Sequence, residues 1–404
     1  MITFNYTARD TSNGKIIKST VQAESERAAA KLLLAQDVVP LEIKEQKAGG
    51  GLFTKFTDRV SSKDKVIFTR QLATLINAGL PLAQALRTVV DQTNNKKLKS
   101  VITNIISDIE GGSTLADSFA KHPSIFNEVY IALIAAGEAS GTLDNSLERI
   151  ANQQEKDAEI MSKVRGAMVY PVIVLVVIGG VITFMILTVV PQIQRLFKDL
   201  HQELPFVTQI MVDLASFVTK FWWLIIILII VGIYFLRRYI KTDNGRRVWD
   251  TLKLRMPVAG NLFQKLYMAR FTRTGETLLA SGVPMLEMLS IAARSANNVV
   301  VSEAINRSAE RVRGGKSLSK GLATEDAIAP LVPQMISIGE QSGGIDKMMA
   351  KAASFFEAEL DAAIKALSTA IEPVLMVVLA VVAGGLVAAI LLPVYGLINT
   401  GALN

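Results

Sequence analysis

Three stretches of the chain are apolar, almost free of charge and long enough to cross a lipid bilayer. Residues 168–190 contain no charged side chain, and at ~1.5 Å per helical residue they cover a hydrocarbon core of about 30 Å. Residues 371–392 form an Ala- and Gly-rich stretch of similar length. The stretch at 218–236 has a shorter apolar run and needs a snorkelling Lys220 to complete the crossing. We predict a transmembrane helix over each range.

Lysine and arginine are distributed unevenly around these three stretches. Lys163 and Arg165 precede the first, and a dense basic run begins at Arg237 after the second, whereas the tail at 393–404 has no charge. Because cytoplasmic flanks carry the excess of basic residues, we expect a cytoplasmic N-terminus, an external loop at 191–217 and an external C-terminus. The first residues show no basic region followed by an apolar one, so we expect no cleaved signal peptide.

One sequence pattern occurs twice along the chain. Phe68-Thr69-Arg70 recurs as Phe271-Thr272-Arg273. The later matches, in the same order, are Gly79 and Pro81 with Gly282 and Pro284, Gly111-Gly112 with Gly314-Gly315, Gly137-Glu138-Ala139-Ser140-Gly141 with Gly339-Glu340-Gln341-Ser342-Gly343, and Tyr170-Pro171 with Glu372-Pro373. Self-similarity of this extent indicates a duplicated structural unit.

The duplication predicts the topology independently of hydropathy. Each copy consists of a polar domain, at 61–167 and at 237–370, followed by an apolar stretch. If both copies leave the cytoplasm in the same direction, one additional span must return the chain between them. The stretch at 218–236 has this place, so the repeat and the hydropathy both predict three spans.

Within each copy the apolar residues follow a helical period. Phe68, Leu72 and Leu75 lie on one helical face. Gly79 suits a left-handed helix end, and Pro81 suits the opening turn of the next helix. We expect about six helices in each copy, the last of which merges into the membrane span.

The first 47 residues differ in kind from the rest. Ile2–Ala8, Lys15–Ala23 and Leu41–Lys44 have strand patterns, and Ser25–Gln36 is an Ala- and Leu-rich helical segment. A Gly-rich linker follows at 48–60. The predicted fold is therefore mainly α: a polytopic membrane protein with three transmembrane helices, two repeated cytoplasmic helical bundles and a small N-terminal α+β module.

Composition removes several classes of chemistry. The chain has no cysteine, and its two histidines, His122 and His201, stand apart in sequence, which argues against thiolate chemistry and Cys/His zinc sites. The net charge of +7 comes with basic residues that crowd beside one predicted span. Membrane topology explains that cluster, so we expect no nucleic-acid partner.

Searches for a catalytic or cofactor site give no convincing match. Gly315-Lys316-Ser317 resembles the end of a phosphate-binding loop, but position 310 is Glu310 where that loop needs a glycine. The Ser-x-x-Lys spacings at Ser62 and Ser317 arise easily by chance. We therefore predict no catalytic residue, no cofactor and no metal site.

Glu138 and Glu340 are the most notable charged residues, because they occupy equivalent positions in the two copies. The preferred interpretation is structural, a helix cap or a turn. The alternatives are a partner-binding surface or weak binding of a cation such as calcium, which favours carboxylate oxygens. Glu372 lies at the predicted cytoplasmic mouth of the third span, where it either snorkels or contacts another subunit in an oligomer.

The combination of motifs resembles a known family. The opening Phe4-x-Tyr6-x-Ala8-x-Asp10, with Gly14-Lys15 and Val39-Pro40-Leu41, and the two units with their Gly-x-Pro, Gly-Glu-x-Ser-Gly and Tyr-Pro or Glu-Pro elements are similar to the inner-membrane platform proteins of type IV pili and type II secretion systems, the PilC/GspF family. Lys18 departs from the glycine that many relatives carry. The resemblance covers nearly the entire chain.

This resemblance implies a scaffold in the cell inner membrane. Its expected partners are a hexameric cytoplasmic ATPase, pilin or pseudopilin subunits, other inner-membrane assembly proteins, membrane lipids and further copies of the chain, in a dimer. ATP-driven motion would pass through the platform to move pilins from the bilayer into a fibre. The chain has no nucleotide site of its own in this scheme, so the motor is another protein.

Two other classes of function fit the sequence less well. A transporter built from duplicated repeats fits poorly, because polar side chains such as Thr183 and Thr188 are rare in the predicted spans and transporters place polar groups at mid-membrane. Substrate uptake by the reconstituted chain would support that alternative. A membrane-bound enzyme lacks a catalytic constellation, and nucleotide turnover by the purified chain would support it.

Overall fold

The structure is a computed structural model that describes residues 2–10, 16–23, 30, 38–45, 60–199, 206–257 and 259–399. The chain divides into two units, a small one formed by the first 61 residues together with 95–97 and a large one formed by the remainder.

The small unit contains a three-stranded antiparallel sheet. Strand β1 (Ile2–Asp10) lies in the middle, between β2 (Ile16–Ala23) and β3 (Val38–Glu45). Tyr6 is opposite Ser19 on one side and Ile43 on the other, with a bulge in the second pairing at Thr7/Ala8. The three predicted strands are present, and the predicted helix at 25–36 lies, except for residue 30, outside the described residues. The α+β class of this module stays a prediction.

The first helical bundle is built from six helices, as predicted, within the described residues 60–184. In order they are α3 (Ser62–Asn77), α4 (Leu82–Gln92), α5 (Lys96–Glu110), α6 (Leu115–Ala120), α7 (Glu128–Ser140) and α8 (Leu143–Phe184). Buried aromatic rings form the centre of this bundle. The ring centroid of Phe119 lies 4.4 Å from that of Phe126 and 5.0 Å from that of Tyr130, distances at which aromatic pairs attract each other.

The second bundle repeats this order of helices, within the described residues 259–399. Its helices are α12 (Ala259–Ala280), α13 (Met285–Ser295), α14 (Val299–Arg313), α15 (Leu318–Ala323), α16 (Leu331–Ser342) and α17 (Ile345–Asn399). A further helix, α11 (Asp243–Arg255), precedes them. Phe271, Leu278 and Ile305 are among the residues buried in its core. Phe271 is the repeat counterpart of Phe68, which is equally buried.

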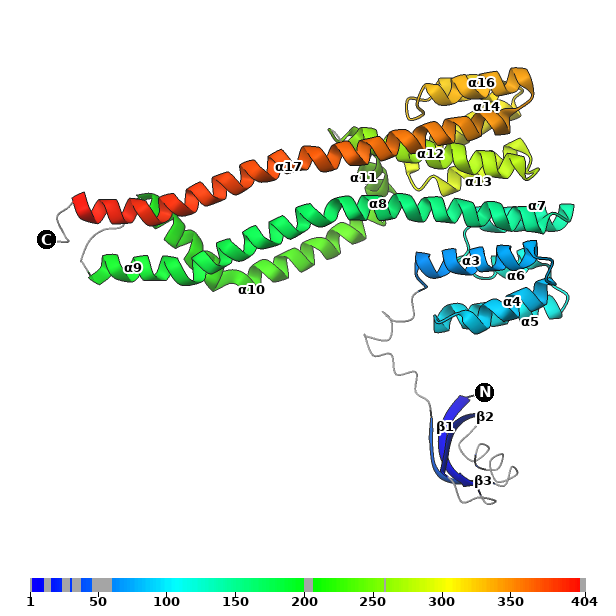
Figure 1. Cartoon of the computed structure of the whole chain (residues 1–404), viewed down its shortest axis with the longest axis horizontal. Coiled ribbons are helices and arrows are strands. Elements are labelled where there is room, and N and C mark those ends of the chain that lie inside the picture. Colours follow the sequence, from blue (N-terminus) through cyan, green and yellow to red (C-terminus); the bar gives the residue numbers. More distant parts are fainter. Residues whose placement is uncertain are drawn as a thin grey trace. The chain divides into compact units, whose positions relative to one another are not determined.

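Within the described residues, three helices are long and apolar enough to cross a membrane: the run from α8 through α9 (Val190–Asp199), the later part of α10 (Phe206–Ile240), and α17. The π-helical turn η1 (Met185–Val189) joins α8 to α9. As predicted, the last helix of each bundle continues into a span, and Figure 1 shows α8 and α17 running on from their bundles. One prediction differs, because the expected loop at 191–217 is helical over 191–199 and 206–217.

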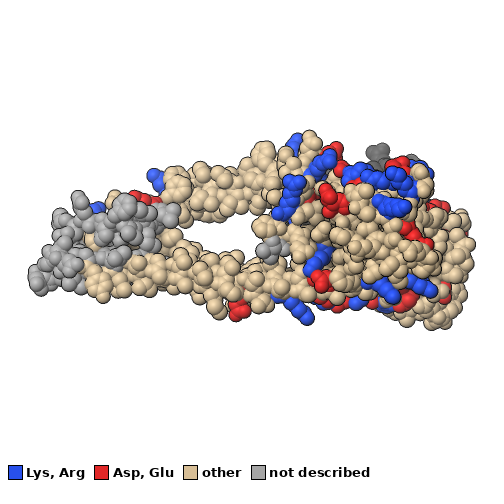
Figure 2. Space-filling view, turned by 90° about the horizontal axis from the view of Figure 1, so that it is seen from above, with Lys and Arg blue, Asp and Glu red and all other residues tan. Residues whose placement is uncertain are grey.

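Charged side chains gather on one part of the large unit. Figure 2 shows Lys, Arg, Asp and Glu crowded over the bundles, whereas the extended arms have long uncharged surfaces. The most apolar windows of the three candidate spans have only 6%, 0% and 6% of their residues buried within the chain. These surfaces need an apolar environment, which a bilayer supplies.

Candidate functional site

The first Gly-Glu-x-Ser-Gly element forms the end of α7. The Glu138 carboxylate accepts hydrogen bonds from the backbone N–H groups of Leu115 at 2.9 Å and Ala116 at 3.1 Å, in the first turn of α6. Because the first N–H groups of a helix have no partner inside the helix and attract negative charge, this contact caps α6 from outside.

The second copy repeats the arrangement. Glu340, near the end of α16, accepts from the N–H of Leu318 at 2.6 Å and of Ser319 at 3.3 Å, and from the Ser319 hydroxyl. Both carboxylates therefore accept hydrogen bonds from N–H or O–H groups. Such donors surround an anionic group, and they do not provide the oxygen ligands that a cation needs. Among the residues that the structure describes, no cluster of three potential metal-binding side chains is found.

The glycines of the same element allow a tight helical hairpin. A Cβ on Gly137 would lie 2.4 Å from the Ser146 Oγ, and one on Gly339 would lie 2.7 Å from the Ile345 Cα, so a side chain at either position would collide with the next helix. The last glycines, Gly141 and Gly343, end their helices with φ of 72° and 71°, in the left-handed region that glycine adopts without strain.

The remaining predicted residues are also placed at helix ends or within long helices. The backbone angle φ lies between 84° and 91° at Gly79, Gly112, Gly282 and Gly315. It is not positive at Gly111 or Gly314. Pro81 and Pro284 are the residues just before α4 and α13, and not in the first turn as expected. Pro171 lies inside α8, and Glu372 and Pro373 lie in α17.

Equivalent ion pairs join the first helix of each bundle to the last. In the first bundle Arg70 donates from Nε to Glu155 at 2.6 Å and from Nη1 to Glu148 at 2.7 Å. In the second, Arg273 donates twice to Glu357, each time at 2.8 Å. Hydrogen bonding by Arg70 lowers the pKa of the Glu155 carboxyl, and hydrogen bonding to Glu357 raises the pKa of Arg273.

The sequence itself contains a signal for these ion pairs. Arg70 and Arg273 end the repeated Phe-Thr-Arg element, and Glu155 and Glu357 have the same spacing from the glycines Gly137 and Gly339. A charge pair kept at one spacing in two copies indicates a contact, and here that contact is bidentate in both copies.

The two copies also contact each other inside the large unit. Lys163 on α8 donates to Asp361 on α17 at 2.6 Å, and Arg294 on α13 pairs with Glu128 on α7. Next to the first pair, Ile160 packs in a buried cluster with Leu360 and Ile364. Burial raises the pKa of the nearby Asp157 carboxyl, which faces Arg270 of the other copy at 4.0 Å. Apolar packing and ion pairs together hold the copies against each other.

A buried glutamate connects two helices of the second bundle. Glu325 lies just after α15, and its side chain is buried. Its carboxylate accepts hydrogen bonds from Arg307 and, at 2.7 Å, from Arg311, both on α14. The Arg307 hydrogen bonds lower the pKa of the Glu325 carboxyl. In the first bundle the charges at the corresponding places are exchanged. The basic residue, Lys121, follows α6, and it pairs at 2.8 Å with the acidic Asp108 on α5.

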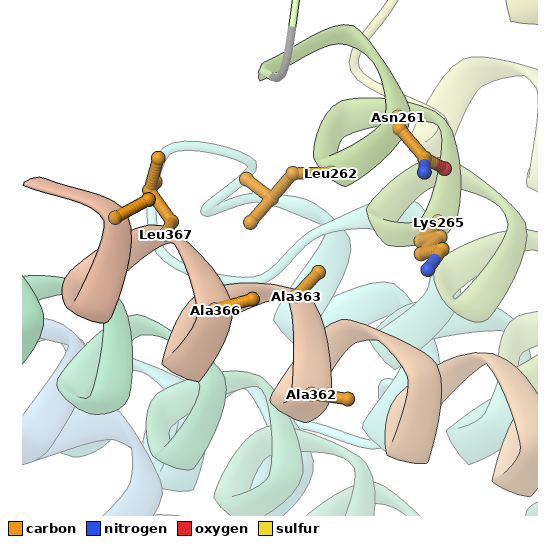
Figure 3. A pocket seen from close by; sticks show the side chains of 8 residues that line it. Asn261, Leu262, Lys265, Ala362, Ala363, Ala366 and Leu367 are labelled. Carbon is orange, nitrogen blue, oxygen red and sulfur yellow. The ribbon is translucent and has the colours of Figure 1, made fainter.

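A hollow of about 570 Å³ lies between the start of α12 and α17, and Figure 3 shows the side chains around it. Its walls are mostly small and apolar, with Leu262 and Leu367 on opposite sides. The one charged side chain in the lining, Lys265, is paired with Glu359 at 2.6 Å. Such a lining offers no nucleophile and no acid–base pair for catalysis.

Comparison with known proteins gives one consistent result. Residues 68–191 and 271–393 each match the family model of type II secretion system protein F, and residues 1–44 match that of its N-terminal domain. The chain is 39% identical to the type IV pilus assembly protein PilC of Thermus thermophilus, over 99% of both chains. It is 34% identical to the type II secretion system protein F of Pseudomonas aeruginosa, over 98% of this chain and 99% of that one. Each repeated match begins in the first helix of a bundle and extends through the following apolar stretch.

Proposed function

The chain belongs to the family of type II secretion system protein F, whose relatives include type IV pilus assembly proteins, and from this premise we propose that it couples a cytoplasmic hexameric ATPase to the insertion of pilin or pseudopilin subunits into a fibre. It is a multi-pass membrane protein of pilus and secretion machinery. In the proposed role it is the inner-membrane platform on which the fibre is assembled.

The observation that carries this proposal is the continuity of α8 and α17. Each begins in a helical bundle, at Leu143 and Ile345, and continues without interruption into an apolar span. Successive turns of an α-helix are joined by backbone hydrogen bonds, so displacing one end displaces the other, although such a bond is missing at Pro171 and at Pro373. A displacement that a motor protein imposes on a bundle would therefore reach the membrane.

The proposed topology places both bundles in the cytoplasm, the N-terminus inside and the C-terminus outside. It is supported by the basic residues beside the spans, such as Lys163 and Arg237. The low burial of the three spans supports contact with lipid, with a second copy of the chain in a dimer, and with the apolar helices of fibre subunits.

We further infer that the chain is not itself an enzyme and that nucleotide hydrolysis belongs to its partner. The proposed scheme uses no cofactor or metal. The bundles act as docking domains, and the repeated caps and ion pairs give those domains a fixed shape.

A deletion strain tests the role. We expect loss of surface fibres or of secretion, with unchanged amounts of pilin or pseudopilin, and recovery when the chain is supplied from a plasmid. Fibre counts by electron microscopy and immunoblots of the subunits measure the two quantities. Normal fibres in the deletion strain would refute the proposal.

A flexible insertion tests the mechanical coupling. A short Gly/Ser segment placed after Gly166, between bundle and span of α8, should leave expression and membrane insertion intact and abolish fibre assembly. The matched control is the same segment placed after Gly50, in the sequence that precedes the first bundle. Normal assembly with the α8 insertion would show that continuity of this helix is not required.

A further inference from the structure

Helix α11 begins directly at the end of a membrane span. Only Lys241 and Thr242 separate the last residue of α10, Ile240, from Asp243. The Thr242 hydroxyl caps the new helix by accepting from the N–H of Gly245 at 3.2 Å. In Figure 1 α11 runs across the direction of α17. Its position therefore lies at the boundary between the span and the bundle.

One face of α11 is fixed against the protein. The buried Asp250 accepts from the N–H of Val299 at 3.0 Å through its carboxylate, and from the Asn298 side chain at 3.3 Å through its backbone carbonyl. At the start of the helix Gly245 is buried against the end of α10, and a Cβ there would lie 2.0 Å from the Tyr239 carbonyl oxygen. These contacts fix the rotation of α11 about its axis.

The opposite face is apolar and exposed. With about 100° between successive residues, Val248 and Leu252 lie across the helix from Asp250, and Met256 extends the same stripe. Their exposed fractions are 57%, 49% and 43%. Trp249 lies beside the stripe, with the Lys253 ammonium 6.0 Å from its ring centroid. A stripe of this kind at the edge of a membrane span needs an apolar partner.

The surroundings of the stripe are strongly basic. Between residues 237 and 256 the chain has seven Lys and Arg against two Asp, and one of those, Asp250, is paired with Lys253 at 2.9 Å. Within the described part of the chain, Arg246 and Arg255 have no ion pair, and both are exposed. A basic cluster beside a span attracts anionic headgroups.

We propose that α11 is an interfacial helix, which inserts Val248, Leu252 and Met256 below the headgroups of the bilayer and binds anionic phospholipid phosphates through Arg255, which lies beside this stripe. An apolar stripe with a neighbouring tryptophan and basic flanks is typical of helices that lie at the membrane interface. A second copy of the chain is a poorer occupant of this face, because it would bring the same positive charge against it. The inference holds on whichever side of the membrane the bundles lie, so it is independent of the proposed function.

Trp249 provides the test, because the chain has only two other tryptophans, Trp222 and Trp223. The full-length W222F/W223F variant is reconstituted into nanodiscs of mixed phosphatidylglycerol and phosphatidylcholine, one of which carries brominated acyl chains. We expect Trp249 fluorescence to be quenched by bromine near the carbonyl end of the acyl chain, and more strongly when phosphatidylglycerol carries the bromine.

Charge variants separate the lipid headgroup from the acyl chain. R255Q should weaken the preference for phosphatidylglycerol by roughly fivefold. The matched control, K316Q, removes one exposed charge in the turn after α14 and should leave the preference unchanged. An unchanged preference in R255Q would overturn the assignment of the phosphate ligand.

Two results would overturn the proposal as a whole. One is quenching of Trp249 by iodide in water with no quenching by brominated lipid, and the other is protection from both, which would indicate a protein partner. If W222F/W223F fails to fold, a nitroxide on L252C in the otherwise cysteine-free chain gives the same answer. A lipid-inserted label collides with oxygen and is protected from a water-soluble nickel complex.

Discussion

Glu138 and Glu340 each reach from the end of one helix to the N-terminus of another, across 22 to 23 residues of sequence. The helices that they cap, α6 and α15, have six residues each. Helices so short are unstable in water by themselves. Each therefore depends on its core contacts and on this carboxylate, which also ties it to the following hairpin.

E340A should destabilise the second bundle by about 1–2 kcal/mol, because two N–H groups of α15 lose their acceptor. Hydrogen exchange at Leu318 and Ser319 should become faster, and the thermal midpoint of the detergent-solubilised chain should fall. E138A should act in the same way on α6. The control E310A removes an exposed carboxylate at the end of α14 and should change little. Unaltered exchange in E340A would contradict the capping role.

G137A should cost about 1–3 kcal/mol, because its Cβ would overlap the side chain of Ser146. The second variant G137A/S146G removes the overlapping atoms and should recover part of the loss in thermal midpoint. G166A is the matched control, since nothing lies within 4 Å of a Cβ there. If G137A and G166A melt alike, the close approach of α7 and α8 is not what requires a glycine.

At the scale of helices and their connections, Glu325 links α14 to the end of α15 through two arginines. Its pKa is lowered in the folded chain, so this stabilisation is fully present above the unfolded pKa of about 4.3 and is lost as the pH falls through the lower, folded value.

E325Q should therefore lower the thermal midpoint at pH 7, by an amount that corresponds to about 1–3 kcal/mol, and the difference from the parent chain should shrink as the pH falls below about 4. D326N is the matched control, because Asp326 is the adjacent carboxylate and is exposed. A difference that stays constant from pH 7 to pH 3 would contradict the charge-assisted link.

Most elements could be predicted from local signals. Gly79 and Gly141 end helices because glycine tolerates positive φ, and the structure confirms both. The helix at 206–217 was missed, because its polar residues, Thr208 and Asp213 among them, lie next to a span and suggested a loop. Pro171 did not end α8, since the helix continues through it. A proline in a membrane helix is tolerated where neighbouring groups satisfy the freed backbone carbonyl.

At the scale of the whole molecule, the sequence predicts the duplication but not the contact between the two copies. Lys163 and Asp361 are 198 residues apart and are not equivalent positions, because the repeat counterpart of Lys163 is Lys365. The buried cluster around Ile160 and Leu360 likewise pairs positions that are not equivalent in the repeat. Periodicity reports which face of a helix is buried, but it contains no information on which distant helix covers that face.

The proposed topology makes a prediction for the entire chain. Because the chain has no cysteine, single cysteines report sidedness without a background. K99C and K320C, one exposed position on each bundle, should react with a membrane-impermeant maleimide only after spheroplasts are permeabilised, whereas H201C should react in intact spheroplasts. Labelling of either bundle position in intact spheroplasts would place that bundle outside and break the proposed arrangement.

The length of α17 has a geometric consequence for a motor that acts at the bundles. Its 55 residues correspond to about 80 Å at ~1.5 Å each. If the helix turned as one rod through Pro373, a pivot of roughly 5° about its bundle end would sweep the far tip through about 7 Å, more than the ~5.4 Å pitch of one helical turn. In the proposed topology, a small rotation of the bundle would thus become a movement of about one helical turn at the far end of the span.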